Sequence, residues 1–117
     1  MIPEDAECRL FLGQTQMELE MYEESSQILL SLVQKDPDYT EAYYFLGQSL
    51  GKQGNLADAH YYLAAYHSRK RDYQTAIVQL QNALKYTKDT ERITQIENKL
   101  KELKDSLAEK NKNEKSE

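Results

Sequence analysis

The stretch from Tyr43 to Leu84, YYFLGQSLGKQGNLADAHYYLAAYHSRKRDYQTAIVQLQNAL, decides the fold of this 117-residue chain. Two similar turns divide it, Gly54-Asn55-Leu56 and Arg71-Asp72-Tyr73, and the small residues Ala59 and Ala76 follow these turns seventeen residues apart. A small residue that recurs at a half-repeat period marks a point where neighbouring helices approach closely. The pattern therefore predicts antiparallel helix pairs, with both alanines buried at helix crossings.

The pattern continues upstream with a period of 34 residues. Residues 6–39 form one repeat and residues 40–73 form a second, so that Leu12-Gly13 in the first corresponds to Leu46-Gly47 in the second. A third unit, at 57–88, shares one helix with the second repeat. Over about 80 of the 117 residues the chain resembles the tetratricopeptide repeat family. The resemblance implies an all-α fold in which antiparallel helix pairs stack as a right-handed superhelix, and it implies binding of other proteins.

The first repeat departs most from the family pattern. Arg9 stands where an aromatic residue is usual, Gln16 where a tyrosine is usual, and Ser25 where an alanine is usual. Helices are nevertheless expected throughout this array, which spans residues 1–88. The apolar spacing and the turn residues predict helices at about 4–19, 22–35, 40–53, 56–70 and 73–87.

Beyond the array, residues 89–109 are predicted to form one more helix. Apolar residues recur there at spacings of 3, 4, 3 and 4 and form one stripe: Ile93, Ile96, Leu100, Leu103 and Leu107. We expect this helix to cap the exposed end of the array, and a homodimer through the stripe at 93–107 is the alternative. Residues 110–117, KNKNEKSE, contain no apolar side chain and are predicted to be disordered.

Charge is unevenly distributed along the chain, whose net charge is −5. Residues 1–40 carry nine acidic and two basic residues, whereas residues 41–88 carry three acidic and six basic ones. Proteins that bind duplex nucleic acid concentrate far more positive charge, so no nucleic-acid partner is expected. No apolar run approaches the roughly 18 residues of a membrane-spanning helix, and no signal peptide is recognisable, so no membrane span is expected either.

Residue types that carry out chemistry are few. His60 and His67 are seven residues apart on one predicted helix. The zinc-binding HExxH motif instead places two histidines four residues apart, with a glutamate after the first. Cys8 is the single cysteine and cannot form an intrachain disulfide. We therefore expect no catalytic residue, no metal site, no cofactor and no enzymatic activity of this chain by itself.

The family resemblance also implies where a partner would bind. In that family the first helix of each pair lines a concave groove, and here the shared helix extends it. The corresponding residues are Leu10, Phe11, Gln14, Met17, Tyr44, Phe45, Gln48, Lys52, Tyr61, Tyr62 and Arg69, with Ser68 beside them. Tyrosine and arginine often dominate protein interfaces. The basic residues with which some members hold a terminal carboxylate are missing, because Leu10, Gln14, Tyr44 and Gln48 occupy those positions.

A narrower resemblance rests on Gly54, on the run Ala59-His60-Tyr61-Tyr62-Leu63, on Tyr66, Asp72 and Ala76, and on the amphipathic tail at 89–107. These features resemble the C-terminal repeat domain of bacterial periplasmic zinc metalloproteases. That resemblance implies an accessory domain that aids substrate or partner recognition, beside a catalytic domain whose HExxH motif is not in this sequence. It also implies a periplasmic location, whereas a cytoplasmic one is expected without it. A protein-interaction module, such an accessory domain and a dimerisation unit are thus the three hypotheses.

Overall fold

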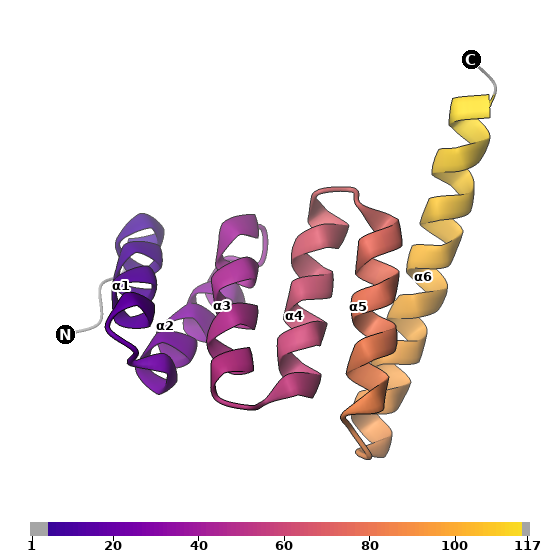
Figure 1. Ribbon diagram of the computed structural model, residues 1–117. Helices are drawn as coiled ribbons and strands as arrows, with labels where there is room; N and C mark the ends of the chain where they lie inside the picture. Colours follow the sequence, from indigo (N-terminus) through magenta and orange to yellow (C-terminus); the bar gives the residue numbers. More distant parts are fainter. Residues whose placement is uncertain (1–4, 116–117) are drawn as a thin grey trace.

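The computed structural model describes residues 5–115, which form six α-helices and no β-strand (Figure 1). The helices are α1 (Ala6–Glu18), α2 (Tyr22–Lys35), α3 (Thr40–Lys52), α4 (Leu56–Arg69), α5 (Tyr73–Lys85) and α6 (Thr90–Lys115). The predicted all-α fold class is therefore confirmed. The first five helices begin and end within two residues of their predicted bounds.

The helices follow one another across an elongated molecule. Each helix packs mainly against its neighbours in sequence, and α1 and α6 lie at opposite ends of the row (Figure 1). The radius of gyration is 15.3 Å, whereas a compact domain of 100 residues has one of about 13 Å. A row of this kind has long exposed faces rather than one enclosed interior.

The apolar core is divided into two clusters along this row. One lies on α2 and α3 and contains Ile28, Leu29, Leu32, Val33, Ala42, Tyr43 and Leu46. The other joins α4, α5 and α6 and contains Ala64, Ala76, Ile77, Leu80, Ala83, Ile96, Leu100 and Leu103. The two clusters meet at α4, because Tyr62 and Tyr66 pack against the first cluster while Tyr61 packs against the second.

Small residues lie where the helices approach each other. Ala59 is 4% exposed and Ala76 is 0% exposed, which confirms the prediction that both are buried. A Cβ atom added to Gly13 would lie 2.7 Å from Leu29 of α2, and one added to Gly47 would lie 2.7 Å from Leu63 of α4. The two Leu-Gly pairs of the sequence are therefore the contact points of α1 with α2 and of α3 with α4.

Ser25 stands where the family resemblance predicts an alanine, and its hydroxyl forms hydrogen bonds inside the core. Its side chain is fully buried. Its Oγ donates to the carbonyl oxygen of Gly13 at 2.8 Å and lies 2.9 Å from the Oγ of Ser49. The polar group is therefore satisfied within the core and links α1, α2 and α3.

Three turns between helices each contain one residue in the left-handed region. These residues are Glu20 (φ 60°), Gly54 (φ 81°) and Arg71 (φ 63°). In each turn the amide of the following residue donates to the carbonyl oxygen five residues earlier, as in a Schellman motif. The acceptors are Gln16, Leu50 and His67 respectively. The positions are 34 and 17 residues apart, which are the same steps as those of the sequence pattern.

Replacing Gly54 by alanine is expected to lower the free energy of unfolding by about 1 kcal/mol. A Cβ atom at Gly54 would meet nothing within 4 Å, so the cost comes only from the left-handed backbone. Urea denaturation should show a lower midpoint with an unchanged slope. Gly54→Asn is the control and should cost less, because asparagine tolerates this conformation. Equal midpoints for Gly54→Ala and the wild type would show that the conformation is not needed.

The last helix differs from its prediction at the C-terminal end. Its predicted end was residue 109, but α6 continues to Lys115. Lys110 Nζ donates to the carbonyl oxygen of Arg71 at 3.2 Å and lies 5.9 Å from the centre of the Tyr73 ring. Lysine and glutamate, which are frequent in this segment, also favour helix. The prediction of disorder is therefore wrong for residues 110–115, and residues 116–117 lie outside the described residues.

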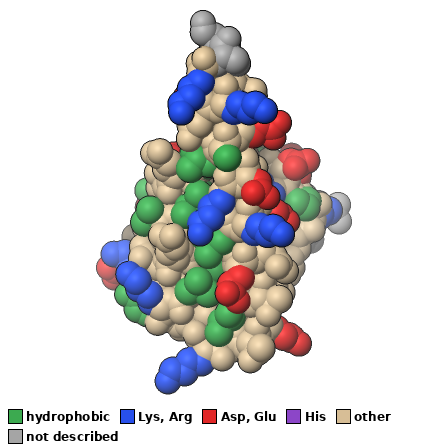
Figure 2. Space-filling view, turned by 90° about the vertical axis from the view of Figure 1, so that its right-hand side faces the viewer, with side chains coloured by type: hydrophobic (Ala, Val, Ile, Leu, Met, Phe, Trp, Pro, Cys, Tyr) green, Lys and Arg blue, Asp and Glu red, His purple; other side chains and the backbone are tan. Residues whose placement is uncertain are grey.

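The apolar stripe of α6 faces α5. Ile96, Leu100 and Leu103 are 0%, 8% and 7% exposed, and they belong to the core cluster of α4 and α5. Ile93 and Leu107, at the two ends of the predicted stripe, are partly buried. Viewed from the α6 end, the surface shows apolar side chains interspersed with basic and acidic ones (Figure 2).

Candidate functional site

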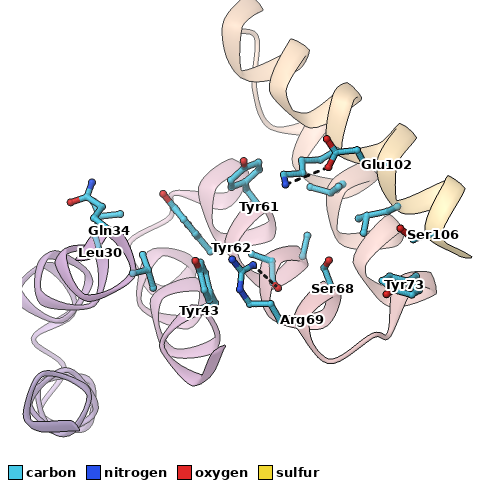
Figure 3. A pocket seen from close by; sticks show the side chains of 16 residues that line it. Leu30, Gln34, Tyr43, Tyr61, Tyr62, Ser68, Arg69, Tyr73, Glu102 and Ser106 are labelled. Carbon is cyan, nitrogen blue, oxygen red and sulfur yellow. Dashed lines mark hydrogen bonds and ion pairs between the residues drawn. The ribbon is translucent and has the colours of Figure 1, made fainter. Parts of the chain in front are cut away.

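A pocket of about 500 Å³ lies between α2, α4 and α6 (Figure 3). Pockets that bind ligands in proteins measure roughly 300–1,000 Å³, so this one has a suitable size. Leu30 and Gln34 of α2 lie on one side and Glu102 and Ser106 of α6 on the other, with Arg69 of α4 between them (Figure 3).

One face of α4 forms the centre of the pocket. Its lining residues recur with helical spacing and are Tyr61, Tyr62, Ala64, Ala65, Ser68 and Arg69. Large tyrosines stand at the start of this face, while Ala64, Ala65 and Ser68 are small. The hollow exists because these three side chains leave space that larger residues would fill.

Apolar side chains from other helices complete the interior of the pocket. Leu30 and Val33 come from the last turns of α2, and Leu80 comes from α5. Tyr43 of α3 and Tyr73 of α5 add two more aromatic rings to the lining. The pocket therefore combines apolar surface with tyrosine hydroxyls, which is a usual composition for a binding site.

The third wall comes from α6. Because Ile96, Leu100 and Leu103 face α5, the residues on the adjacent face of α6 line the pocket. These are Lys99, Glu102 and Ser106. Lys99 Nζ lies 3.5 Å from Glu102 Oε2, and both side chains are more than half exposed.

Tyr43 and Arg69 hold each other in position. The Tyr43 hydroxyl donates to the carbonyl oxygen of Pro37 at 2.7 Å, and Arg69 Nε donates to the same oxygen at 3.1 Å. The guanidinium of Arg69 lies 4.2 Å from the centre of the Tyr43 ring. Tyr62 stacks on Tyr43 with 6.5 Å between ring centres. The aromatic side of the pocket is thus preorganised.

The two stacked tyrosines remain protonated at neutral pH. Burial raises the pKa of Tyr43, and the nearby charge of Arg69 offsets part of that effect. Burial also raises the pKa of Tyr62, against an opposing effect of Arg92. Each hydroxyl is therefore present as a hydrogen-bond donor.

An ion pair ties α6 to α4 beside the pocket. Arg92 Nη2 donates to Asp58 Oδ1, and its guanidinium lies 4.6 Å from the centre of the Tyr61 ring. Burial alone would lower the pKa of Arg92, but the hydrogen bond and the charge of Asp58 raise it overall. Arg92 therefore stays charged, and the pair fixes the distance between two walls of the pocket.

The structure brings only some of the predicted groove residues together. Tyr61, Tyr62 and Arg69 line the pocket, with Ser68 beside them. Leu10, Phe11 and Gln14 of α1 lie together in a separate, more open hollow with Tyr39. The prediction had placed all of these residues in one groove.

The remaining predicted residues lie on α1 and α3 and do not line this pocket. Tyr44 is 38% exposed, and its ring centre lies 5.3 Å from those of Phe45 and Tyr66. Phe45 packs against the core cluster of α2 and α3. Met17 and Gln48 are partly buried, and Lys52 is exposed at the end of α3.

The contributions of α2 and α6 to the pocket were not predicted. Lys99, Glu102 and Ser106 flank the apolar stripe that is visible in the sequence. If the helix that this stripe packs against were known, the direction of these three residues could be predicted. Leu30 and Gln34 have no such signal, because they lie far in sequence from the α4 and α6 residues that they face.

The histidines and the cysteine lie apart from one another. His60 Nδ1 is 2.7 Å from Gln79 Oε1, and its ring stacks on Tyr86. His67 Nδ1 is 3.8 Å from Asp72, and Cys8 is exposed on α1. Within residues 5–115, no three side chains of His, Cys, Asp or Glu are grouped so that they could hold a metal ion. None of the helices in that range has both the length and the apolar character needed to cross a membrane.

No protein-family model matches the sequence, and no curated protein matches it. The functional argument therefore rests on the pocket between α2, α4 and α6.

Proposed function

We propose that this chain is a protein-interaction module that binds a short segment of a partner polypeptide in the pocket between α2, α4 and α6, without catalysing a reaction. The observation that supports this most strongly is the lining itself. Four tyrosines and Arg69 surround an apolar interior of about 500 Å³. Tyrosine and arginine are enriched among the residues that contribute most to protein interfaces.

We also propose that the row of helices is an array of the tetratricopeptide type, with α6 as the helix that caps it. Two observations support this. The left-handed residues Glu20, Gly54 and Arg71 recur at steps of 34 and 17 residues. Gly13 and Gly47 occupy equivalent positions at two helix crossings. Such arrays commonly serve as binding surfaces for other proteins.

The dimensions of the pocket suit a short segment. The α4 face from Tyr61 to Arg69 covers eight steps, or about 12 Å at 1.5 Å per residue. An extended chain covers that distance with about four residues. One apolar side chain can occupy the interior while the backbone meets the tyrosine hydroxyls and Ser68 at the rim.

The apolar stripe at 93–107 offers a second copy little surface. Ile96, Leu100 and Leu103 are buried against α5, so a dimer through them would require α6 to leave α5. An accessory role beside a metalloprotease catalytic domain remains compatible with the proposal, because a substrate or partner segment would use the same pocket.

Filling the pocket is expected to abolish binding. Peptides selected from a displayed library of random 12-residue sequences on the wild-type chain should bind a Ser68→Trp variant at least tenfold more weakly, because the indole occupies the space beside Arg69. Fluorescence anisotropy with the selected peptides measures the dissociation constants. Gln81→Trp is the matched control, since Gln81 is exposed on α5 and does not line the pocket.

Circular dichroism and the urea midpoint establish that both tryptophan variants fold. Binding by Gln81→Trp should stay within twofold of the wild type. The proposal is contradicted if no peptide is enriched over a blank surface, or if Ser68→Trp binds the selected peptides as tightly as the wild type does.

A further inference from the structure

We infer that the segment bound in this pocket carries acidic residues beside its apolar anchor, and that α6 selects for them; this inference rests on the proposed function. The outer wall of the pocket is then more than a cover for α5. Lys99 of α6 and Arg69 of α4 would meet the partner's carboxylates from two sides.

The charges that line the pocket favour an anionic partner. Arg69 and Lys99 are basic, and Glu102 is the one acidic residue of the lining. Asp36 and Asp38, which flank Pro37 near Arg69, do not line the pocket. The lining is thus net positive by one charge, although the whole chain has a net charge of −5.

The side chain of Arg69 is oriented by its contacts within the chain and has no carboxylate partner among residues 5–115. Its Nε is engaged by the carbonyl oxygen of Pro37, and its guanidinium plane rests on the Tyr43 ring. No carboxylate among residues 5–115 lies within ion-pairing distance of it. An arginine whose orientation is already fixed loses less freedom when it binds an anion.

Lys99 is available in a different way. Its only ion pair in the described part of the chain is with Glu102, three residues on in the same helix, at 3.5 Å. Both side chains are more than half exposed, and ion pairs of this kind contribute little to stability. A carboxylate that enters the pocket can therefore replace Glu102 as the partner of Lys99 at small cost.

Negative charge elsewhere in the chain confines the attraction for an acidic partner to the lining of the pocket. Residues 1–40 carry nine acidic and two basic residues. Two of the acidic residues, Asp36 and Asp38, flank Pro37 beside Arg69 without lining the pocket, so the attraction for an acidic segment comes from Arg69 and Lys99. Because exposed charges are screened over about 8–10 Å at physiological salt, the attraction acts only near the pocket.

The test uses three fluorescent peptide pools with acetylated and amidated ends, so that no terminal charge contributes. Each pool has a central leucine or phenylalanine, flanked by glutamates, by glutamines or by lysines, with neutral residues elsewhere. The wild-type chain is expected to bind the glutamate pool at least tenfold more tightly than the lysine pool. Raising the salt concentration should reduce that difference.

Charge reversal then locates the source of the preference. Lys99→Glu is expected to reduce the ratio of glutamate to lysine binding at least tenfold. Lys101→Glu makes the same charge change on an exposed residue of α6 that does not line the pocket, and its ratio should stay within threefold of the wild type. Urea midpoints confirm that both variants fold.

The outcomes separate this inference from the proposed function. If the wild type binds library peptides but shows equal or tighter binding of the lysine pool, the inference is wrong while peptide binding stands. If Lys99→Glu and Lys101→Glu change the ratio of glutamate to lysine binding equally, the preference does not come from Lys99 in the pocket. The inference is then again wrong. If neither the random library nor any pool binds, the proposed function fails as well.

Discussion

An Ile96→Ala variant is expected to lose about 2–5 kcal/mol of unfolding free energy, the usual cost of truncating a large buried aliphatic side chain. Ile96 is 0% exposed and lies in the cluster that contains Ile77 and Leu80 of α5. Truncation removes its apolar contacts and leaves a cavity between α5 and α6. Since α6 packs chiefly against α5, the substitution weakens the contact between these two helices. That contact positions α6 as the outer wall of the pocket.

Urea denaturation measures the total loss, and amide hydrogen exchange locates it. Protection should fall most in α5 and α6 and least in α1 and α2, because stability in a row of helices is local. Glu97→Ala is the control, since Glu97 is exposed on the same helix and should change stability by less than about 0.5 kcal/mol. Equal midpoints for Ile96→Ala and Glu97→Ala would mean that α6 does not rest on α5 as described.

Gly47→Ala and Gly51→Ala are expected to have opposite effects, although both glycines lie on α3. A Cβ atom at Gly47 would lie 2.7 Å from Leu63 Cγ and 3.1 Å from the carbonyl oxygen of Ala59. Overpacking of this kind costs about 1–3 kcal/mol, because α3 and α4 must separate. A Cβ atom at Gly51 would lie 3.7 Å from the Ala59 Cβ, which is an ordinary contact.

Gly51→Ala should therefore stabilise the chain by up to about 1 kcal/mol, because alanine favours helix more than glycine does. The two substitutions are chemically identical and lie one helical turn apart, so both gain the same helix propensity. The difference between their unfolding free energies therefore measures the steric cost at the contact of α3 with α4. Thermal or urea unfolding of the two variants measures it. A stabilising Gly47→Ala would show that α3 and α4 do not approach each other closely at this point.

The bounds of the first five helices could be predicted because their signals are local. Pro37 separates α2 from α3, and the turn residues around Gly54 and Arg71 separate the helices that follow. The small residues Ala59 and Ala76 then indicate which faces meet. Each of these inferences needs only residues that are close together in the sequence.

The pocket could be predicted only in part, because distant segments form it. The family resemblance indicated Tyr61, Tyr62 and Arg69 on the shared helix, but it otherwise pointed to α1 and α3 instead of α2 and α6. The end of α6 was missed for a similar reason. Lys110 contacts the carbonyl oxygen of Arg71, which is 39 residues away, and a local sequence pattern cannot predict such a contact.

Because each helix packs mainly against its neighbours in sequence, we expect mechanical tension to separate the helices one after another. A pull on the two outermost helices loads one helix contact at a time instead of shearing many contacts together. Such a row can open one helix at a time from an end, because each helix depends chiefly on its neighbours. Detachment of α6 would remove Lys99, Glu102 and Ser106 from the pocket, so a bound segment would be released before the rest of the row unravels.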